Sequence, residues 1–370
     1  MSTLNVNKIA DASGGVLAPI SSVMRNRIIN GAMVIDQRNA GASVTQNGAG
    51  TQYSLDRWGV YGGVSSKFTL QQNAGSVTPP AGFTNYLGCT SSSAYTIGSG
   101  DLFIVRQFIE GFNTSDLGWG TANAKTVTLS FWVRSSLTGT FGGSLMNSAN
   151  NRSYPFSYTI NAANTWEQKS ITIAGDTSGT WIGATNGVGL RLHFSMGTGS
   201  TFSGTSGSWS GSTFYSATGA TSVVGTNGAT FFITGVQLEK GTQATSFEYR
   251  QYGQELALCQ RYYQLLTTGV ADRMVSGGGG FYNSTTASCP IPLKVTMRTT
   301  PTLSSNSGTN YWAIYNNGAA TTFNAFTGIM GEVTDNIGGA YVAGLSRTAG
   351  NYGYFVTNNA SAFLAYQAEL

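Results

Sequence analysis

The segment Val127-Thr-Leu-Ser-Phe-Trp-Val133 carries an apolar side chain at every second position. This period of two is typical of a β-strand that packs one face against a core. The same alternation recurs in 169–173, 188–194 and 229–238, and Gly, Asn, Ser and Pro punctuate the chain between such runs. Because no long amphipathic helix separates the runs, a parallel βαβ sheet is disfavoured and an antiparallel jelly-roll sandwich is predicted.

The complete prediction is an all-β chain in four parts, with a short helix between two β domains. Residues 1–30 form an N-terminal segment that is too short to bury a core, and residues 31–246 form the jelly-roll β-sandwich. A linker helix occupies 247–268, and residues 269–370 form a second, smaller β-sandwich domain. Within this last part, Gly277-Gly-Gly-Gly280 is interpreted as a flexible joint.

The N-terminal segment contains a short β-like run of Leu4, Val6 and Ile9, which a turn-forming segment follows. Two interpretations of this run stay open. Either it anchors the chain on another protein, or it adds a strand to the sheet of the following domain.

The predicted linker helix carries Leu256, Cys259, Tyr263 and Leu266 at steps of three and four residues, which would place them on one apolar stripe. The stripe either packs on its own domain or lies at a threefold axis between copies of the chain. A lone helix between two β domains has few other partners, so we expect the second arrangement and take these four residues as trimer-interface candidates.

The composition excludes several classes of function. Only 9% of the 370 residues are charged, and the formal net charge of +4 includes no run of Lys or Arg, so no nucleic-acid binding is predicted. No apolar stretch is long enough to insert into a membrane, and the first residues lack the features of a signal peptide. Cys89, Cys259 and Cys289 share no metal-binding spacing, so we expect three buried thiols in a protein that folds in a reducing cytoplasm.

The residues that catalysis requires are sparse, and no enzymatic activity is predicted. His193, which is the sole histidine, lies inside an alternating strand and is interpreted as an ordinary strand residue. A polysaccharide depolymerase that uses two carboxylates remains a less favoured alternative. Its candidate residues are Asp36, Asp56, Asp101, Glu110, Asp116, Glu167 and Asp176.

Aromatic side chains offer a clearer binding chemistry, because flat rings pack against the apolar faces of sugars while amides and hydroxyls bond their OH groups. Trp132 lies among apolar residues and is assigned to the core, and Trp58 is also interpreted as a structural residue. The segment 198–228 is rich in Gly, Ser and Thr and is interpreted as an ordered loop rather than a flexible one. The candidates for glycan binding lie near glycine-rich turns, where we expect their side chains to face solvent: Trp119, Trp181, Trp209, Tyr215 and Trp312.

Several short stretches, in the right order along nearly the whole chain, resemble tail-fibre and related virion proteins of tailed bacteriophages that contain a carbohydrate-binding-module-like jelly roll. The first is Asn26-Arg-Ile-Ile-Asn-Gly-Ala-Met-Val-Ile-Asp-Gln-Arg-Asn39, and Tyr53-Ser-Leu-Asp-Arg-Trp58 follows it. Thr234-Gly-Val-Gln-Leu-Glu-Lys-Gly241 and Thr245-Ser-Phe-Glu-Tyr-Arg250 resemble the end of that jelly roll, and Leu256-Ala-Leu-Cys-Gln-Arg-Tyr-Tyr263 resembles the segment after it. Val295-Thr-Met-Arg-Thr-Thr-Pro301 and Ala365-Tyr-Gln-Ala-Glu-Leu370 resemble a C-terminal domain that often follows.

The resemblance implies a homotrimer in the virion, made in the host cytoplasm, that is attached through residues 1–30 and contributes to binding the host surface, with a glycan as the expected receptor. Family members also serve as collar, adaptor or head-fibre proteins, so a purely architectural part without a ligand is the alternative. Related jelly rolls often hold a calcium ion, but the sequence has no EF-hand loop and we assign no cofactor.

Overall fold

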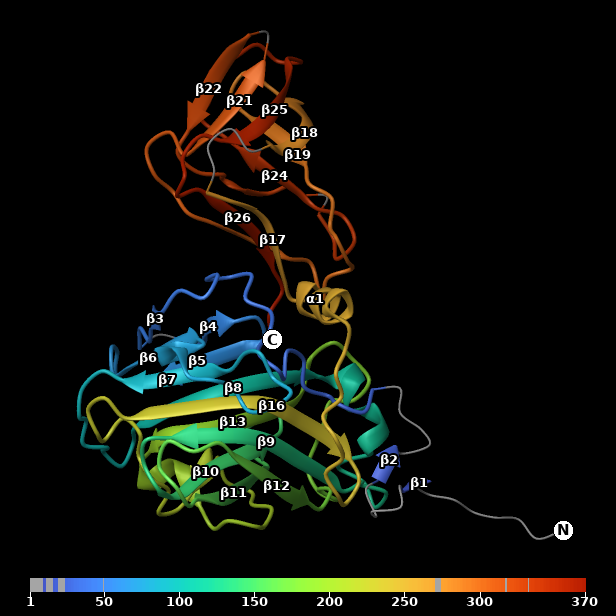
Figure 1. Cartoon of the computed structure of the whole chain (residues 1–370). Coiled ribbons are helices and arrows are strands. Elements are labelled where there is room, and N and C mark those ends of the chain that lie inside the picture. The colour runs from blue at the N-terminus through green and yellow to red at the C-terminus, as the bar shows by residue number, and fades with distance from the viewer. Residues whose placement is uncertain are drawn as a thin grey trace, which may run out of the picture. The chain divides into compact units, whose positions relative to one another are not determined.

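A computed structural model describes residues 9–10, 16–18, 24–48, 50–269, 274–316, 318–331 and 333–370. The chain divides into two compact units, Met1–Arg250 and Gln251–Leu370, which we call unit 1 and unit 2 (Figure 1). Both are built from strands, as the alternating segments predict.

Unit 1 is a sandwich of two six-stranded antiparallel sheets. Sheet I has the order β11-β10-β13-β8-β5-β4, and sheet II has the order β12-β9-β16-β7-β6-β3. The strands of sheet I are β4 (Gln52–Leu55), β5 (Trp58–Gly62), β8 (Leu102–Glu110), β10 (Gly139–Met146), β11 (Ser153–Ile160) and β13 (Val188–Thr198). Those of sheet II are β3 (Val44–Thr45), β6 (Phe68–Gln72), β7 (Leu87–Ser91), β9 (Val127–Ser135), β12 (Glu167–Ile173) and β16 (Thr230–Lys240). The chain passes repeatedly from one sheet to the other, which confirms the jelly-roll sandwich.

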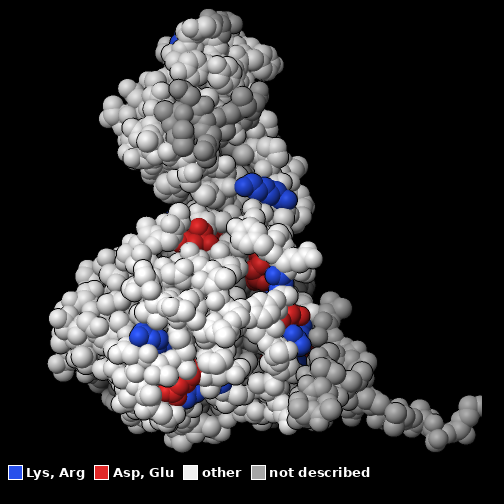
Figure 2. Space-filling view, viewed as in Figure 1, with Lys and Arg blue, Asp and Glu red and all other residues white. Residues whose placement is uncertain are grey.

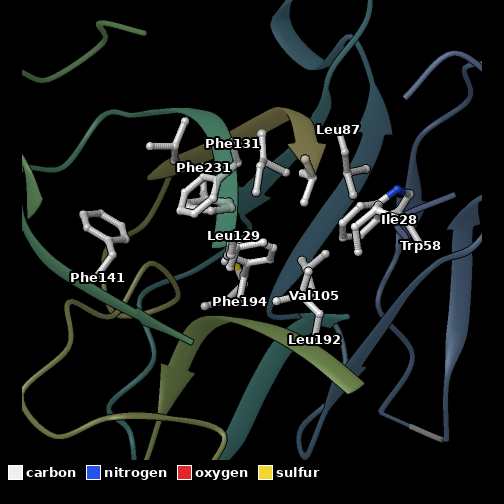
Figure 3. Close-up of a cluster of buried hydrophobic side chains, with 14 of the residues drawn as sticks. Ile28, Trp58, Leu87, Val105, Leu129, Phe131, Phe141, Leu192, Phe194 and Phe231 are labelled. Atoms are coloured by element: carbon white, nitrogen blue, oxygen red, sulfur yellow. The ribbon is translucent and has the colours of Figure 1, made fainter. Parts of the chain in front are cut away.

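The core of unit 1 lies between the sheets (Figure 3). Phe131 of β9 and Phe194 of β13 are fully buried, and their rings meet edge to face with centroids 5.1 Å apart. This contact joins the two sheets in the geometry that aromatic quadrupoles favour. Trp58 is buried as predicted, whereas Trp132 is only half-buried, because it alternates with Phe131 and points away from the core.

The sandwich begins before residue 31, where the sequence analysis placed its start. The side chain of Asn26 accepts hydrogen bonds from the backbone N–H groups of Ile28 and Leu238 and donates one to the carbonyl of Val236 at 3.1 Å. These hydrogen bonds hold residues 26–30 against β16, so the segment is part of unit 1. Among the anchor candidates, Leu4 and Val6 lie outside the described residues. Ile9 lies in β1 (Ile9–Ala10), which pairs with β2 (Val16–Ala18).

The same contacts tie the two ends of unit 1 together. Glu248 accepts a hydrogen bond from the backbone N–H of Asn26 at 2.8 Å. Arg250 donates to the carbonyl of Ile28 at 3.2 Å and to that of Asn26, and it forms an ion pair with Glu248 at 3.2 Å. Residues 26–28 and 248–250 thus form one closed junction.

Among the described residues of unit 2 are one α-helix and two further sheets. The helix is α1 (Tyr252–Gln260). A three-stranded sheet has the order β17-β26-β20, with β17 (Tyr263–Thr268), β20 (Thr302–Ser305) and β26 (Phe363–Gln367). A seven-stranded sheet has the order β22-β21-β25-β18-β19-β24-β23. Its strands are β18 (Met274–Phe281), β19 (Ala287–Pro290), β21 (Trp312–Asn316), β22 (Ala319–Phe323), β23 (Gly328–Ile329), β24 (Gly339–Val342) and β25 (Tyr352–Thr357).

The helix is shorter than the predicted 247–268, and this changes the interpretation of its apolar stripe. Leu256 and Cys259 lie on α1, but Tyr263 and Leu266 belong to β17. This strand pairs with β26, the last strand in the sequence. This long-range pairing overrides the local helical periodicity. The four trimer-interface candidates therefore do not form one helical stripe, and Cys259 and Tyr263 are buried within the chain.

The predicted joint at Gly277–Gly280 is wrong, because all four glycines lie inside β18. A Cβ atom on Gly279 would lie 2.5 Å from the ring of Phe355 and 2.6 Å from the carbonyl oxygen of Ser288. Close approach of neighbouring strands, rather than flexibility, requires glycine there.

The three cysteines agree with the prediction, since Cys89, Cys259 and Cys289 are buried thiols. Burial raises the pKa of Cys289 to about 12, so this thiol is not a reactive thiolate. In the described part of the chain, no helix has the length and apolar character needed to cross a membrane.

Candidate functional site

Three of the predicted binding residues come together at one end of unit 1. The ring centroids of Trp119 and Trp181 are 4.8 Å apart, and Trp209 lies 5.3 Å from the first and 5.4 Å from the second. Each belongs to a different loop, and every pair meets edge to face. Sequence spacing gives no sign of this cluster.

The tryptophan cluster mainly packs three loops of unit 1 against one another. Each indole N–H donates to a backbone carbonyl: Trp119 to Lys125 at 2.7 Å, Trp181 to Ser178 at 3.1 Å and Trp209 to Ala174 at 2.7 Å. Trp119 is only 8% exposed, so the expectation that it faces solvent is wrong. These contacts hold three loops together and leave none of the indole N–H groups for a ligand.

Beside this cluster is a pocket of about 300 Å³, which we call the Trp181 pocket. Trp181 contributes a half-buried ring to it, and Thr114 contributes a hydroxyl. That hydroxyl lies within hydrogen-bond distance of two backbone carbonyls, those of Gly111 and Ile182. The pocket is therefore apolar and offers few groups that would orient a ligand.

Trp312 is not a surface residue. It is fully buried in unit 2, where its ring meets Phe326 edge to face at 5.0 Å. The expectation of solvent exposure is wrong here, because the strand that contains Trp312 turns this side chain toward the core.

Tyr215 lines a larger pocket of about 420 Å³ on the outer face of sheet I, which we call the Tyr215 pocket. Its lining residues are Gly50, Thr51, Tyr61, Gly63, Gly100, Leu102, Arg106, Phe202 and Tyr215. Two tyrosines, a phenylalanine, a threonine and an arginine thus line one cavity.

Strand alternation positions the floor of the Tyr215 pocket. Val60 and Val105 on the neighbouring strands β5 and β8 point into the core and are buried. The residues that follow them, Tyr61 and Arg106, must point to the opposite face. Neither was singled out in the sequence, although a lone arginine within the apolar run 102–109 is a signal that could have been used.

The segment 198–228 forms one wall of this pocket and is ordered. It includes β14 (Ser203–Gly204) and β15 (Ser216–Ala217), which pair in parallel. The rings of Phe202 and Tyr215 meet at 5.7 Å, and Ser210 forms a bridge with Ser153 at the edge of sheet I. The segment has defined structure, as expected for an ordered loop, and its side chains Phe202 and Tyr215 line the pocket.

The electrostatics of the Tyr215 pocket are dominated by arginine. The guanidinium carbon of Arg106 lies 4.8 Å from the ring centre of Phe108 and 5.6 Å from that of Tyr61. Arg191 lies 5.2 Å from the same Phe108 ring. Burial lowers the pKa of both guanidinium groups, and each nevertheless keeps its charge near neutral pH.

His193 lies next to these cations on the outer face of sheet I. It is fully buried, its Nδ1 is 3.0 Å from the hydroxyl of Ser144, and the ring of Tyr215 covers it at 4.9 Å. Burial, followed by the charges of Arg106 and Arg191, holds its pKa well below the usual range, so the ring is neutral.

The carboxylates considered for depolymerase chemistry hold the structure together. Asp176 forms a two-pronged ion pair with Arg152, and Asp116 contacts both Arg27 and Lys240. Asp36, Asp56, Asp101 and Glu167 accept hydrogen bonds from nearby backbone or side-chain groups, and Glu110 is buried. Over the described ranges, no three His, Cys, Asp or Glu side chains are grouped so as to hold a metal ion.

No family model and no curated protein matches this chain. Among solved structures, the enzymatically active domain of tailspike protein 4 from bacteriophage CBA120 is similar over 58% of this chain, at 12% identity and a TM-score of 0.31. The similar region spans 21% of that tailspike chain. The family 11 carbohydrate-binding module of Clostridium thermocellum, in complex with a mixed-linked tetrasaccharide, is similar over 55% of this chain and 98% of its own, at 11% identity and a TM-score of 0.28.

A tandem pair of family 22 carbohydrate-binding modules from Paenibacillus barcinonensis is similar over 90% of this chain and 98% of its own, at 10% identity and a TM-score of 0.24. At these identities and TM-scores the likenesses assign neither a family nor a function to the chain.

Proposed function

We propose that this chain is a non-enzymatic fibre protein of a bacteriophage virion that binds carbohydrate on the host surface through the Tyr215 pocket. The part of the N-terminal segment that precedes residue 26 attaches it to another virion protein, and the assembled fibre contains three copies of the chain.

The composition of the Tyr215 pocket carries the binding part of this proposal. Tyr61, Phe202 and Tyr215 offer ring surfaces for the apolar faces of a sugar, and Thr51 and Arg106 offer polar groups for its oxygens. Its volume of about 420 Å³ is within the roughly 300–1,000 Å³ of small-ligand sites. The Trp181 pocket is less suitable, because the indole N–H groups and the Thr114 hydroxyl beside it already contact backbone carbonyls.

The composition of the chain and its resemblance to phage fibres support the structural part. Charged side chains are scattered over the face that Figure 2 shows, and most of that face consists of uncharged residues. A surface of hydroxyls, amides and glycine stays hydrated and packs readily against copies of itself. Several copies would also strengthen a weak interaction, since linked sites raise the overall affinity by orders of magnitude.

Glycan-array binding by the full chain tests the proposal. We expect host-envelope saccharides to be retained, and Tyr61→Ala and Tyr215→Ala each to weaken retention at least tenfold. Tyr282→Ala is the matched control, because Tyr282 is 83% exposed in unit 2 and lies outside the pocket. Equal retention by all three variants would remove the Tyr215 pocket from the proposal.

Two further measurements separate this proposal from its rivals. A purely architectural collar, adaptor or head-fibre protein would bind no saccharide from its host envelope. A depolymerase would release reducing ends from host capsule, which we do not expect. Sedimentation equilibrium should give a mass of three chains, and a monomer would contradict the fibre assembly.

A further inference from the structure

Arg106 is a partly buried cation without an anionic partner. Over the described ranges, no Asp or Glu lies within ion-pair distance of Arg106 or Arg191, although five other basic residues of unit 1 form such pairs. Burying an uncompensated charge is unfavourable, so proteins usually pair it. An arginine that lines a pocket without an acidic partner is therefore unusual, and a bound anion would explain it.

Most hydrogen-bond donors of Arg106 are unused. A guanidinium carries five N–H donors. Within the described structure, the side-chain hydrogen bond of Arg106 is the one from Nη2 to the hydroxyl of Thr51, and Nε is buried without a partner. Because Thr51 and Arg106 both line the Tyr215 pocket, a ligand there would meet a cation and a hydroxyl side by side.

Neighbouring groups add positive potential without competing for the ligand. Arg191 donates to the side chain of Asn150 and to the carbonyl of Ser148 at 2.9 Å, so its guanidinium is held in place on the same Phe108 ring. His193 is neutral and is covered by Tyr215. The net local charge is therefore positive, and Arg106 is the cation that lines the cavity.

The walls of the pocket decide which anion fits. Rings in the floor and in one wall favour a sugar ring over a bare inorganic ion, and the chain has no basic run that would follow a nucleic-acid backbone. A planar carboxylate matches the planar guanidinium and can accept two parallel hydrogen bonds from it.

From this arrangement we infer that the Tyr215 pocket is specific for an acidic carbohydrate whose carboxylate, such as that of a uronic acid residue, binds Arg106. This inference rests on the proposed function and adds the chemical class of its ligand.

The test uses one oligosaccharide in two forms. Oligogalacturonate and the same oligosaccharide with its carboxyl groups reduced to alcohols are titrated into the full chain by calorimetry. We expect the acidic form to bind about 10- to 100-fold more tightly, as a hydrogen-bonded charge pair typically contributes. Arg106→Gln should abolish this difference by lowering the affinity for the acidic form to that for the neutral form.

Arg134→Gln is the matched control, because Arg134 lies on β9 of sheet II and should leave both affinities unchanged. Circular dichroism of each variant establishes that it is folded. If both sugars bind with the same affinity and Arg106→Gln changes neither affinity, the acidic specificity is wrong and the proposed function stands. If neither sugar binds but the array retains neutral saccharides, the acidic specificity is also wrong. If the array retains no saccharide at all, the proposed function itself is wrong. A preference for a sulfated oligosaccharide over the carboxylate would overturn the assignment of the anion.

Discussion

Replacement of Asn26 by alanine tests whether residues 26–30 belong to the sandwich or to a separate anchor. Asn26 is 2% exposed and satisfies the backbone N–H groups of Ile28 at 2.9 Å and Leu238 at 3.1 Å. Alanine would leave both groups buried without this partner, and each such loss costs about 1–3 kcal/mol. We therefore expect Asn26→Ala to lower the free energy of unfolding of unit 1 by about 2–6 kcal/mol.

Urea unfolding followed by tryptophan fluorescence measures this effect. Trp312 is the one tryptophan of unit 2 among the seven in the chain, so the signal reports chiefly on unit 1. Asn123→Ala is the control, because Asn123 is exposed and surface changes usually stay within about 0.5 kcal/mol. If Asn26→Ala unfolds at the same urea concentration as the parent chain, residues 26–30 contribute nothing to the sandwich and the reasoning fails.

Three further predictions follow from packing and charge. Gly279→Ala should destabilise unit 2 by about 1–3 kcal/mol in thermal unfolding, because the new methyl group would overlap the ring of Phe355. Gly278→Ala is its control, since a Cβ atom there meets nothing within 4 Å, and equal melting temperatures for the two variants would contradict the packing argument. Burial alone would raise the pKa of Glu167, but hydrogen bonds from Lys169 and from nearby backbone N–H groups outweigh burial and hold it at about 2. The stability that this carboxylate contributes should be present above its unfolded pKa, roughly 4.3, and be lost as the pH falls toward 2. Glu167→Gln should therefore be less stable than the parent at pH 7 and equally stable below pH 2, and a difference that persists in acid would refute the assignment.

The strands could be predicted because their signal is local. Alternation within the runs beginning at Val127 and Val188 depends on neighbouring residues alone, and β9 and β13 start at those residues. The end of α1 could not be found in the same way. The segment 263–268 has a helical spacing of apolar residues, but it pairs with β26 roughly a hundred residues later, and no local pattern reports such a partner.

The candidate site was predicted in part. Of the five aromatic residues singled out in the sequence, Tyr215 lines the pocket that we propose as the binding site. Trp312 failed because its exposure depends on which face of β21 meets the core, a property of the whole sheet. Arg106 was missed because a single charged residue within the apolar run 102–109 does not by itself indicate a binding site. Its role depends on the residues beside it on the neighbouring strands, which the sequence does not reveal.

The junction between Asn26 and Arg250 determines how mechanical tension would pass through unit 1. The two residues are 224 positions apart in the chain, yet the side chain of Arg250 bonds directly to the carbonyl of Asn26. A pulling force that enters ahead of Asn26 and leaves beyond Arg250 would cross this short bridge and bypass the sheets. The sandwich would stay unloaded until the bridge breaks, so the Tyr215 pocket would keep its shape while a force acts on the molecule.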